Sequence, residues 1–140
     1  MWTLLKILLL GGGVTLTTQT VDIGQAWVLL TPSEPLNVVT EGAALYISVP
    51  GLESAGSDVL SRIKAAELRY PNGCVRARLV GVDGKELEMA NRSAGASNAE
   101  TLLILSAEQG IPTDRRFAKV LLSAACELKG VRITWQNYSM

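Results

Sequence analysis

The sequence predicts an all-β protein, an antiparallel β-sandwich of about seven strands with at most one short helix. Apolar and polar residues alternate in short runs, which is the pattern of strands with one buried face and one solvent face. Proline and glycine turn signals separate these runs, and only residues 52–66 show helical spacing. Because the 140 residues contain no internal repeat and no linker, we expect one domain over residues 27–140 behind an N-terminal segment.

Residues 1–26 have the pattern of a signal peptide or membrane anchor. Lys6 precedes an apolar stretch that fits a secretory signal and is shorter than the about 20 residues of a spanning helix. The best cleavage pattern, Gly24-Gln25-Ala26, would leave Trp27 as the first residue. Alternatively the segment is a retained anchor, or residues 14–21 form a strand. We therefore expect an exported protein (periplasmic, envelope or secreted), held at the inner membrane if the segment is retained.

The sequence of the first half of the domain predicts two strands. Residues 26–30 form a short apolar run, and the prolines at 32 and 35 require that this strand ends there or lies at a sheet edge. Residues 43–49 alternate more clearly, with three apolar side chains on one face: Leu45, Ile47 and Val49.

Residues 52–66 form the expected helix, with Ser57 or Asp58 as its N-cap. Three apolar residues at helical spacing are expected to face the core, namely Val59, Ile63 and Ala66. Arg62 and Lys64 are expected to face solvent. The turn signal Pro71-Asn72-Gly73 follows the helix.

Residues 74–89 predict a β-hairpin, because Asp83-Gly84 joins two alternating runs and suits a tight turn in which both residues have positive φ. Residues 91–98, small and polar, predict a flexible loop. Residues 101–106 form an unbroken apolar run, which indicates a strand buried on both faces.

Residues 116–138 carry the clearest strand pattern and predict a second hairpin. In its first strand Phe117 and Leu121 share a face, and in its second strand apolar residues alternate with polar ones. A polar turn ending at Gly130 joins them. We expect the core to contain the following residues: Ile47, Leu79, Ile104, Val120, Leu122, Ile133 and Trp135.

The composition excludes several classes of function. Lysine and arginine total 13, as do aspartate and glutamate, so the zero net charge gives no electrostatic footprint for nucleic acid. Near-zero net charge instead favours association between proteins. The chain has no histidine, which excludes Ser-His-Asp and Cys-His catalysis and zinc sites built with imidazole. We expect no cofactor and no metal.

The two cysteines, Cys74 and Cys126, predict a disulfide, since export would place them in an oxidising compartment. The alternative is a pair of buried free thiols. Cys74 is in phase with Arg76 and Arg78 on the expected solvent face, so it would turn inward only if a bulge follows residues 71–73.

A few residues are candidates for a binding surface. Tyr138 is the aromatic residue most expected to be exposed, and Arg115 and Arg116 form a basic pair whose alternative role is a surface ion pair with Asp114. The acidic residues Asp83, Glu86 and Glu88 fit a solvated strand face better than a carboxylate catalyst.

These observations predict a non-enzymatic envelope or secreted protein that acts by protein–protein interaction or self-assembly. The alternative is a carbohydrate- or small-ligand-binding module that uses exposed aromatic residues. An enzyme built on carboxylates is the third possibility, and no motif in the chain supports it.

Overall fold

The computed structural model describes residues 14–17, 19–39, 42–52, 58–96 and 100–138. It contains one described helix, α2 (Val59–Arg69), between the fifth and sixth strands of the chain. The strands are β1 (Val14–Thr15), β2 (Val21–Ile23), β3 (Val28–Leu30), β4 (Leu36–Asn37), β5 (Gly42–Val49), β6 (Val75–Gly81), β7 (Glu86–Ala96), β8 (Thr101–Ser106), β9 (Arg116–Ala124) and β10 (Leu128–Tyr138). The prediction of a mainly β fold with one short helix is confirmed.

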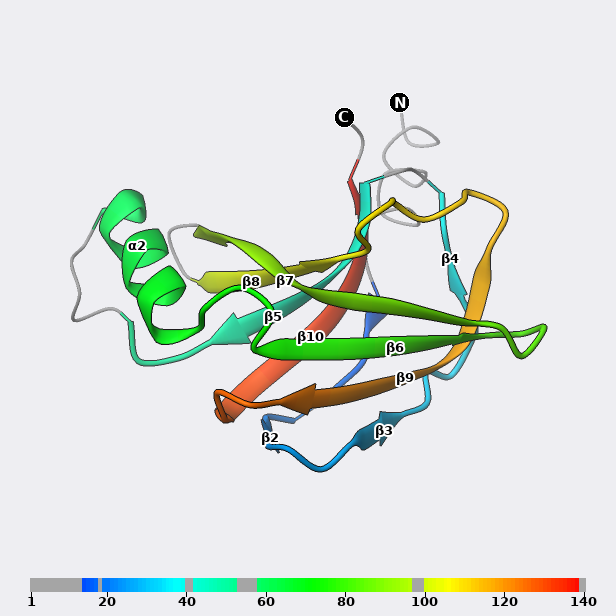
Figure 1. Cartoon of the computed structure of the whole chain (residues 1–140), viewed down its shortest axis with the longest axis horizontal. Helices are drawn as coiled ribbons and strands as arrows, with labels where there is room; N and C mark the ends of the chain where they lie inside the picture. The colour runs from blue at the N-terminus through cyan, green and yellow to red at the C-terminus, as the bar shows by residue number, and fades with distance from the viewer. Residues whose placement is uncertain (1–13, 18, 40–41, 53–57, 97–99, 139–140) are drawn as a thin grey trace.

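The ten strands belong to one antiparallel sheet with the order β1-β10-β5-β8-β7-β6-β9-β3, in which β2 also pairs with β10 and β4 with β9. The sheet curls on itself, as Figure 1 shows. Although β9 and β10 are far apart in this order, the rings of Phe117 and Trp135 meet edge to face at 6.2 Å. The expected sandwich of about seven strands is therefore confirmed only as antiparallel and all-β, because eight of the ten described strands form one continuous path and the other two pair with strands of that path.

The core fills the inside of this curl. Trp135 is 1 % exposed, and its Nε1 donates a hydrogen bond to the Asn37 carbonyl oxygen at 3.0 Å, which satisfies the indole N–H. Six of the seven predicted core residues are buried. The exception is Ile104, which is half-buried because its neighbours Leu103 and Leu105 occupy the inner face of β8.

The predicted hairpin over residues 116–138 is wrong, although both of its strands exist. β9 pairs with β6, β3 and β4, whereas β10 pairs with β5, β1 and β2. Glu127, with φ of 48°, lies in the turn between them, whereas Gly130, with φ of 64°, lies within β10 at the irregularity between Leu128 and Val131, so the turn ends before the predicted Gly130. The chain therefore crosses from one side of the curl to the other, and the two strands meet through side chains across the core.

The predicted face of Phe117 is also wrong. In the β6–β9 ladder Leu79 lies opposite Val120, but Gly81 lies opposite Phe117, so β9 contains one extra residue at this point. Such a bulge reverses the alternation of faces. Phe117 consequently shares the buried face of Val120, and Leu121 is half-buried on the other face.

The predicted hairpin of residues 74–89 is confirmed as β6 and β7, whose ladder runs from Arg76↔Ala90 to Val80↔Glu86. Its turn differs from the prediction, because among the described residues Gly84 has positive φ (86°) and Asp83 does not. Gly81 donates to the Lys85 carbonyl oxygen at 2.7 Å and accepts from the Gly84 N–H at 2.9 Å. This pattern fits a three-residue loop that ends with a left-handed glycine.

The predicted loop over residues 91–98 is wrong for the part that the structure describes. β7 continues to Ala96 and pairs with β8, with an irregularity between Asn91 and Ser93. Residues 97 and 98 lie outside the described residues. The small side chains reduce strand propensity but leave the backbone free to pair, and β8 provides the partner.

Helix α2 begins after Asp58, whose carboxylate accepts a hydrogen bond from the Ser61 N–H at 3.1 Å, as predicted for an N-cap. It extends to Arg69, three residues beyond the expected end, and it contacts β7 and β8. Arg62 was expected to face solvent but is only 6 % exposed, and its Nη1 donates to the Glu100 carbonyl oxygen at 3.4 Å. Val59 is correspondingly exposed.

The remaining predicted strands are present. Residues 26–30 contain β3, which ends the strand order, as its following prolines require. β5 is buried on both faces, since Tyr46 is buried as well as Ile47. In β8 one face is buried and the other only half-buried, so the prediction of burial on both faces is confirmed in part.

Part of the N-terminal segment belongs to the sheet. Residues 1–13, which include most of the apolar stretch, lie outside the described residues. β1 pairs with β10 through Val14↔Trp135, and β2 pairs with β10 through Ile23↔Leu128, with Ile23 fully buried. No described helix has the length and apolar character needed to cross a membrane.

Candidate functional site

One candidate surface surrounds Trp27, the residue that precedes edge strand β3. Trp27 is 39 % exposed and Leu29 is 52 % exposed, although large apolar side chains are the ones that folding normally buries. In the ladder, Leu29 lies opposite Leu121 on β9, and Leu121 lies opposite Arg78 on β6. We call Trp27, Leu29, Arg76 and Arg78 the Trp27 surface.

Two arginines hold the Trp27 ring. The guanidinium carbon of Arg78 lies 4.8 Å from the ring centroid, and that of Arg76 lies 5.8 Å from it. At these distances each cation is attracted by the negative face of the indole, typically by about 0.5–1 kcal/mol at an exposed site. The two contacts therefore restrain the exposed indole ring on the protein surface.

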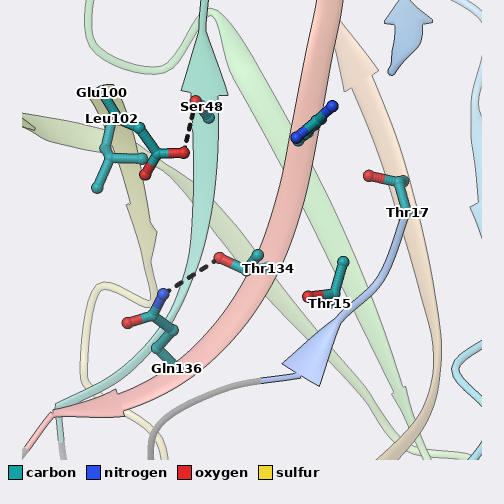
Figure 2. Close-up of a pocket in the computed structure, with 8 residues that line it drawn as sticks. Thr15, Thr17, Ser48, Glu100, Leu102, Thr134 and Gln136 are labelled. Carbon is teal, nitrogen blue, oxygen red and sulfur yellow. Dashed lines mark hydrogen bonds between the residues drawn. The ribbon is translucent and has the colours of Figure 1, made fainter. Parts of the chain in front are cut away.

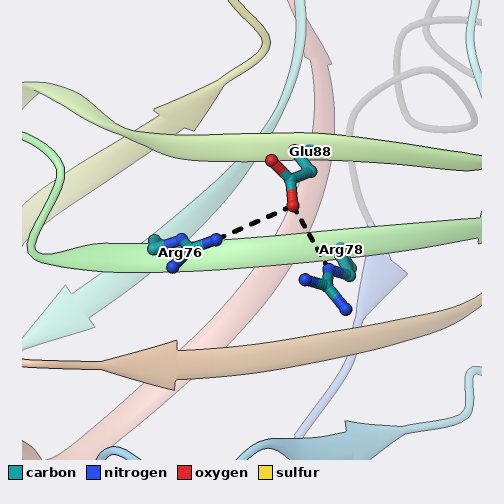
Figure 3. A network of polar contacts seen from close by, with 3 residues as sticks. All are labelled: Arg76, Arg78 and Glu88. Carbon is teal, nitrogen blue, oxygen red and sulfur yellow. Dashed lines mark hydrogen bonds and ion pairs between the residues drawn. The ribbon is translucent and has the colours of Figure 1, made fainter.

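Glu88 on β7 orients the same two arginines, as Figure 3 shows. One of its oxygens, Oε1, lies 3.3 Å from Arg78 Nε and 3.7 Å from Arg76 Nη2. Because these side chains are exposed, the ion pairs add little stability. One carboxylate faces two guanidinium groups, so the Trp27 surface keeps a local positive charge.

A second candidate is a polar groove of about 260 Å³ over β1, β10, β5 and β8, shown in Figure 2. A neighbouring hollow of about 240 Å³ shares Ser48, Glu100 and Arg132 with it. We call this region the Arg132 groove, and the residues that line its larger part are Thr15, Thr17, Ser48, Glu100, Leu102, Arg132, Thr134 and Gln136. All of them except Leu102 have a polar or charged side chain.

The binding surface predicted at Arg115, Arg116 and Tyr138 stays a prediction, because the structure describes the contacts of the two arginines but not the Tyr138 side chain. Arg115 donates to the Lys85 carbonyl oxygen at 3.3 Å and lies over the Phe117 ring. Arg116 Nε donates to Asn37 Oδ1 at 3.0 Å. Among the described ion pairs, none joins either arginine to Asp114. Tyr138 closes β10, but its side chain lies outside what the structure describes.

The predicted disulfide is present, and Cys74 and Cys126 have Cα atoms 5.5 Å apart. No bulge after the turn is needed. The β6–β9 ladder ends at Val75↔Ala124, and both cysteines lie just beyond this pair. The disulfide therefore closes the end of the ladder next to the core.

The acidic residues lack the features of a catalytic pair. The pKa of Asp83 is held below its ordinary value of 3.8, first because its carboxylate accepts a hydrogen bond from the Lys85 N–H and also because Arg115 and Lys85 are nearby. Asp83 thus stays ionised as a turn residue. Within the described residues, no group of three histidine, cysteine, aspartate or glutamate side chains could hold a metal ion.

No protein family, curated protein or solved structure matches this chain. The two surfaces are therefore the features of this chain that point to a function. Neither surface was predicted from the sequence. The signal for Trp27 was an aromatic residue placed directly before a short strand at the sheet edge. The alternating polar residues at 132, 134 and 136 on β10 were a signal for the groove.

Proposed function

We propose that this protein is an exported, non-enzymatic binding protein that assembles with itself or with another protein through the Trp27 surface. The observation that carries the proposal is Trp27, a large aromatic side chain that is exposed and yet fixed by Arg76 and Arg78. Tryptophan and arginine are enriched among the residues that dominate binding energy at protein interfaces. Because the ring is already restrained, binding costs less conformational entropy.

The place of this surface in the fold supports the same function. Trp27 and Leu29 lie at the β3 end of the strand order. Beyond β3, the main-chain groups pair with no further strand among the described residues. Sheet edges are common places for another chain to add a strand. The zero net charge of the chain also favours association, and the disulfide fits an oxidising compartment outside the cytoplasm.

Sedimentation velocity of the full chain over a series of concentrations tests self-assembly. We expect wild type to form dimers or larger species as concentration rises, and Trp27→Ala to stay monomeric. Leu68→Ala is the matched control, because Leu68 is 84 % exposed on α2, away from β3. A monomeric wild type at every concentration, or equal loss in both variants, would contradict assembly through this surface.

Carbohydrate stacking on Trp27 is the second candidate, favoured by the exposed part of its ring. Quenching of tryptophan fluorescence by a neutral oligosaccharide, abolished by Trp27→Ala in a protein that remains monomeric, would favour it over protein assembly.

A further inference from the structure

We propose that the Arg132 groove binds a small sugar acid, a molecule with one carboxylate and several hydroxyl groups. This site lies on β1, β10, β5 and β8, and it goes beyond the protein contact proposed for the Trp27 surface on β3 and β6.

The register of the sheet places the groove residues on one face. Arg132 lies opposite Ser48 on β5, which lies opposite Leu102 on β8. In the next row, Thr15 on β1 lies opposite Thr134 on β10. Residues directly opposite in antiparallel strands point to the same side. The apolar neighbours Ile133 and Trp135 point to the core, so Arg132 and Thr134 lie on the opposite face of the sheet, where Arg132 is exposed and Thr134 is half-buried.

Arg132 supplies the positive charge for the carboxylate. Among the described residues, the ion pairs join Arg76, Arg78 and Lys129 to glutamates, and none includes Arg132. Its planar guanidinium can donate two parallel hydrogen bonds to a carboxylate, which adds geometric selectivity to the charge.

The rest of the groove suits hydroxyl groups. Glu100 Oε1 accepts from Ser48 Oγ at 3.4 Å, as the dashed line in Figure 2 shows, and retains capacity for other donors. Thr17 Oγ1 accepts from the Ile133 N–H at 3.1 Å, which leaves its hydroxyl hydrogen to donate. Thr134 Oγ1 accepts from Gln136 Nε2 at 3.4 Å. The groove thus offers both donors and acceptors.

The size of the groove and the position of its positive charge further restrict the class of ligand that can bind. The larger part of the groove has a volume of about 260 Å³, which is below the range of about 300–1,000 Å³ typical of drug-sized ligands, so this part fits a single sugar. Neighbouring strands are about 4.8 Å apart, so Arg132 on β10 and the residues on β8 lie two strand spacings from each other. One sugar ring spans this interval, with its carboxylate on Arg132 and its hydroxyls toward Ser48 and Glu100.

Chemical-shift titration of the isotope-labelled full chain tests the proposal, with glucuronate, glucose and serine as probes. We expect glucuronate to shift resonances of β10 and β5 with a Kd of about 1 mM, the affinity expected for a ligand of about 13 non-hydrogen atoms. Glucose should bind roughly tenfold more weakly, because it lacks the carboxylate. Serine offers a carboxylate and an ammonium group, and it tests whether the groove recognises an amino acid instead.

Arg132→Gln should weaken glucuronate binding by roughly tenfold or more and leave the weak glucose binding unchanged. Arg132→Lys should retain part of the preference, since it keeps the charge but loses the planar fork. Arg92→Gln, an exposed arginine on β7 outside the groove, is the matched control and should bind like wild type. Dispersed spectra of each variant establish that it is folded.

Several results would overturn the proposal. These are equal binding of glucose and glucuronate, unchanged glucuronate binding in folded Arg132→Gln, tighter binding of serine than of glucuronate, or no shifts at all. None of these results depends on the oligomeric state, so the outcome for the Trp27 surface is tested separately.

Discussion

Trp135 and Trp27 have opposite environments in the same sheet. Trp135 is fully enclosed, contacts the Phe117 ring and donates a hydrogen bond to the Asn37 carbonyl oxygen. Trp27 is held on the surface by two arginines. The alternation of residues 131–135 predicted the first environment, whereas the run of residues 26–30 gave no comparable pattern for the second.

The first prediction compares these tryptophans. We expect Trp135→Ala to lower the free energy of unfolding by about 3–5 kcal/mol, because it empties a large aromatic site and removes a satisfied hydrogen bond. Trp27→Ala should cost about 1–2 kcal/mol, because it removes two exposed cation–π contacts. Chemical denaturation measures both, and a loss below about 1 kcal/mol for Trp135→Ala would contradict its place in the core.

Asn91 shows why a polar sequence need not be a loop. Its side-chain oxygen accepts from the Val75 N–H at 2.9 Å, and its side-chain nitrogen donates to the carbonyl oxygens of Tyr70 and Pro71, each at 3.1 Å. These bonds hold the segment between the end of α2 and the start of β6 against Asn91 on β7. The sequence identifies Asn91 as polar, but only the tertiary structure supplies the three partners that allow its burial.

At the scale of elements, the cap of α2 gives a pH-dependent prediction. The pKa of Asp58 is below its ordinary value of 3.8, first because its carboxylate accepts a hydrogen bond from Ser61. A folded-state pKa that is lowered contributes stability above the unfolded pKa, and this contribution is lost as pH falls through the folded pKa.

We therefore expect Asp58→Ala to lower stability at pH 7, with the difference from wild type shrinking as the pH falls below 3.8. Asp58→Asn is the control, because asparagine caps helices without titrating and should remain close to wild type at pH 7. Thermal unfolding followed by circular dichroism across this pH range measures the difference. An effect of Asp58→Ala that does not depend on pH would contradict the proposed role of the ionised carboxylate.

The N-terminal strands give the next prediction. Besides the buried Ile23, the Asp22 carboxylate accepts from the Gly130 N–H at 2.9 Å, and the Gly24 carbonyl oxygen accepts from the Ala124 N–H at 2.8 Å. A chain that begins at Trp27 would lose all three interactions. If the N-terminal segment is cleaved, we therefore expect the cleavage site to lie upstream of Val14 rather than after Ala26.

Two truncations test this expectation. A chain that begins at Val14 should unfold at a temperature close to that of the full chain. A chain that begins at Trp27 should lose at least about 2–5 kcal/mol, the range for emptying one large aliphatic core site. N-terminal sequencing of the native protein gives an independent result, and a folded native protein that begins at Trp27 would contradict the role of β1 and β2.

For the whole molecule, local patterns predicted the strands better than their pairing. The β6–β7 hairpin was predictable because its partners are adjacent in sequence and joined by a glycine turn. The separation of β9 from β10 was not, because it depends on the curl of the complete sheet. The Phe117 bulge and the burial of Arg62 likewise follow from neighbours distant in sequence. Both candidate surfaces combine residues from several strands, so no single run of sequence identifies them.

The disulfide connects this topology with the stability of the molecule. It joins positions 52 residues apart, so in the chain-entropy model it stabilises the fold by about 4 kcal/mol through its effect on the unfolded chain. That contribution is a large part of the about 5–15 kcal/mol that stabilises typical domains. The protein should therefore depend on an oxidising compartment for much of its stability.

We expect the double variant Cys74→Ala, Cys126→Ala to lose about 4 kcal/mol in chemical denaturation. Wild type that has been reduced and alkylated should lose a similar amount, because both treatments remove the same cross-link. A non-reduced digest of the native protein should contain one peptide pair joined through Cys74 and Cys126. Two free thiols in the native protein would contradict the cross-link and remove the main support for export. If the bond is present but its removal leaves the free energy of unfolding unchanged, the unfolded chain is already compact at this loop.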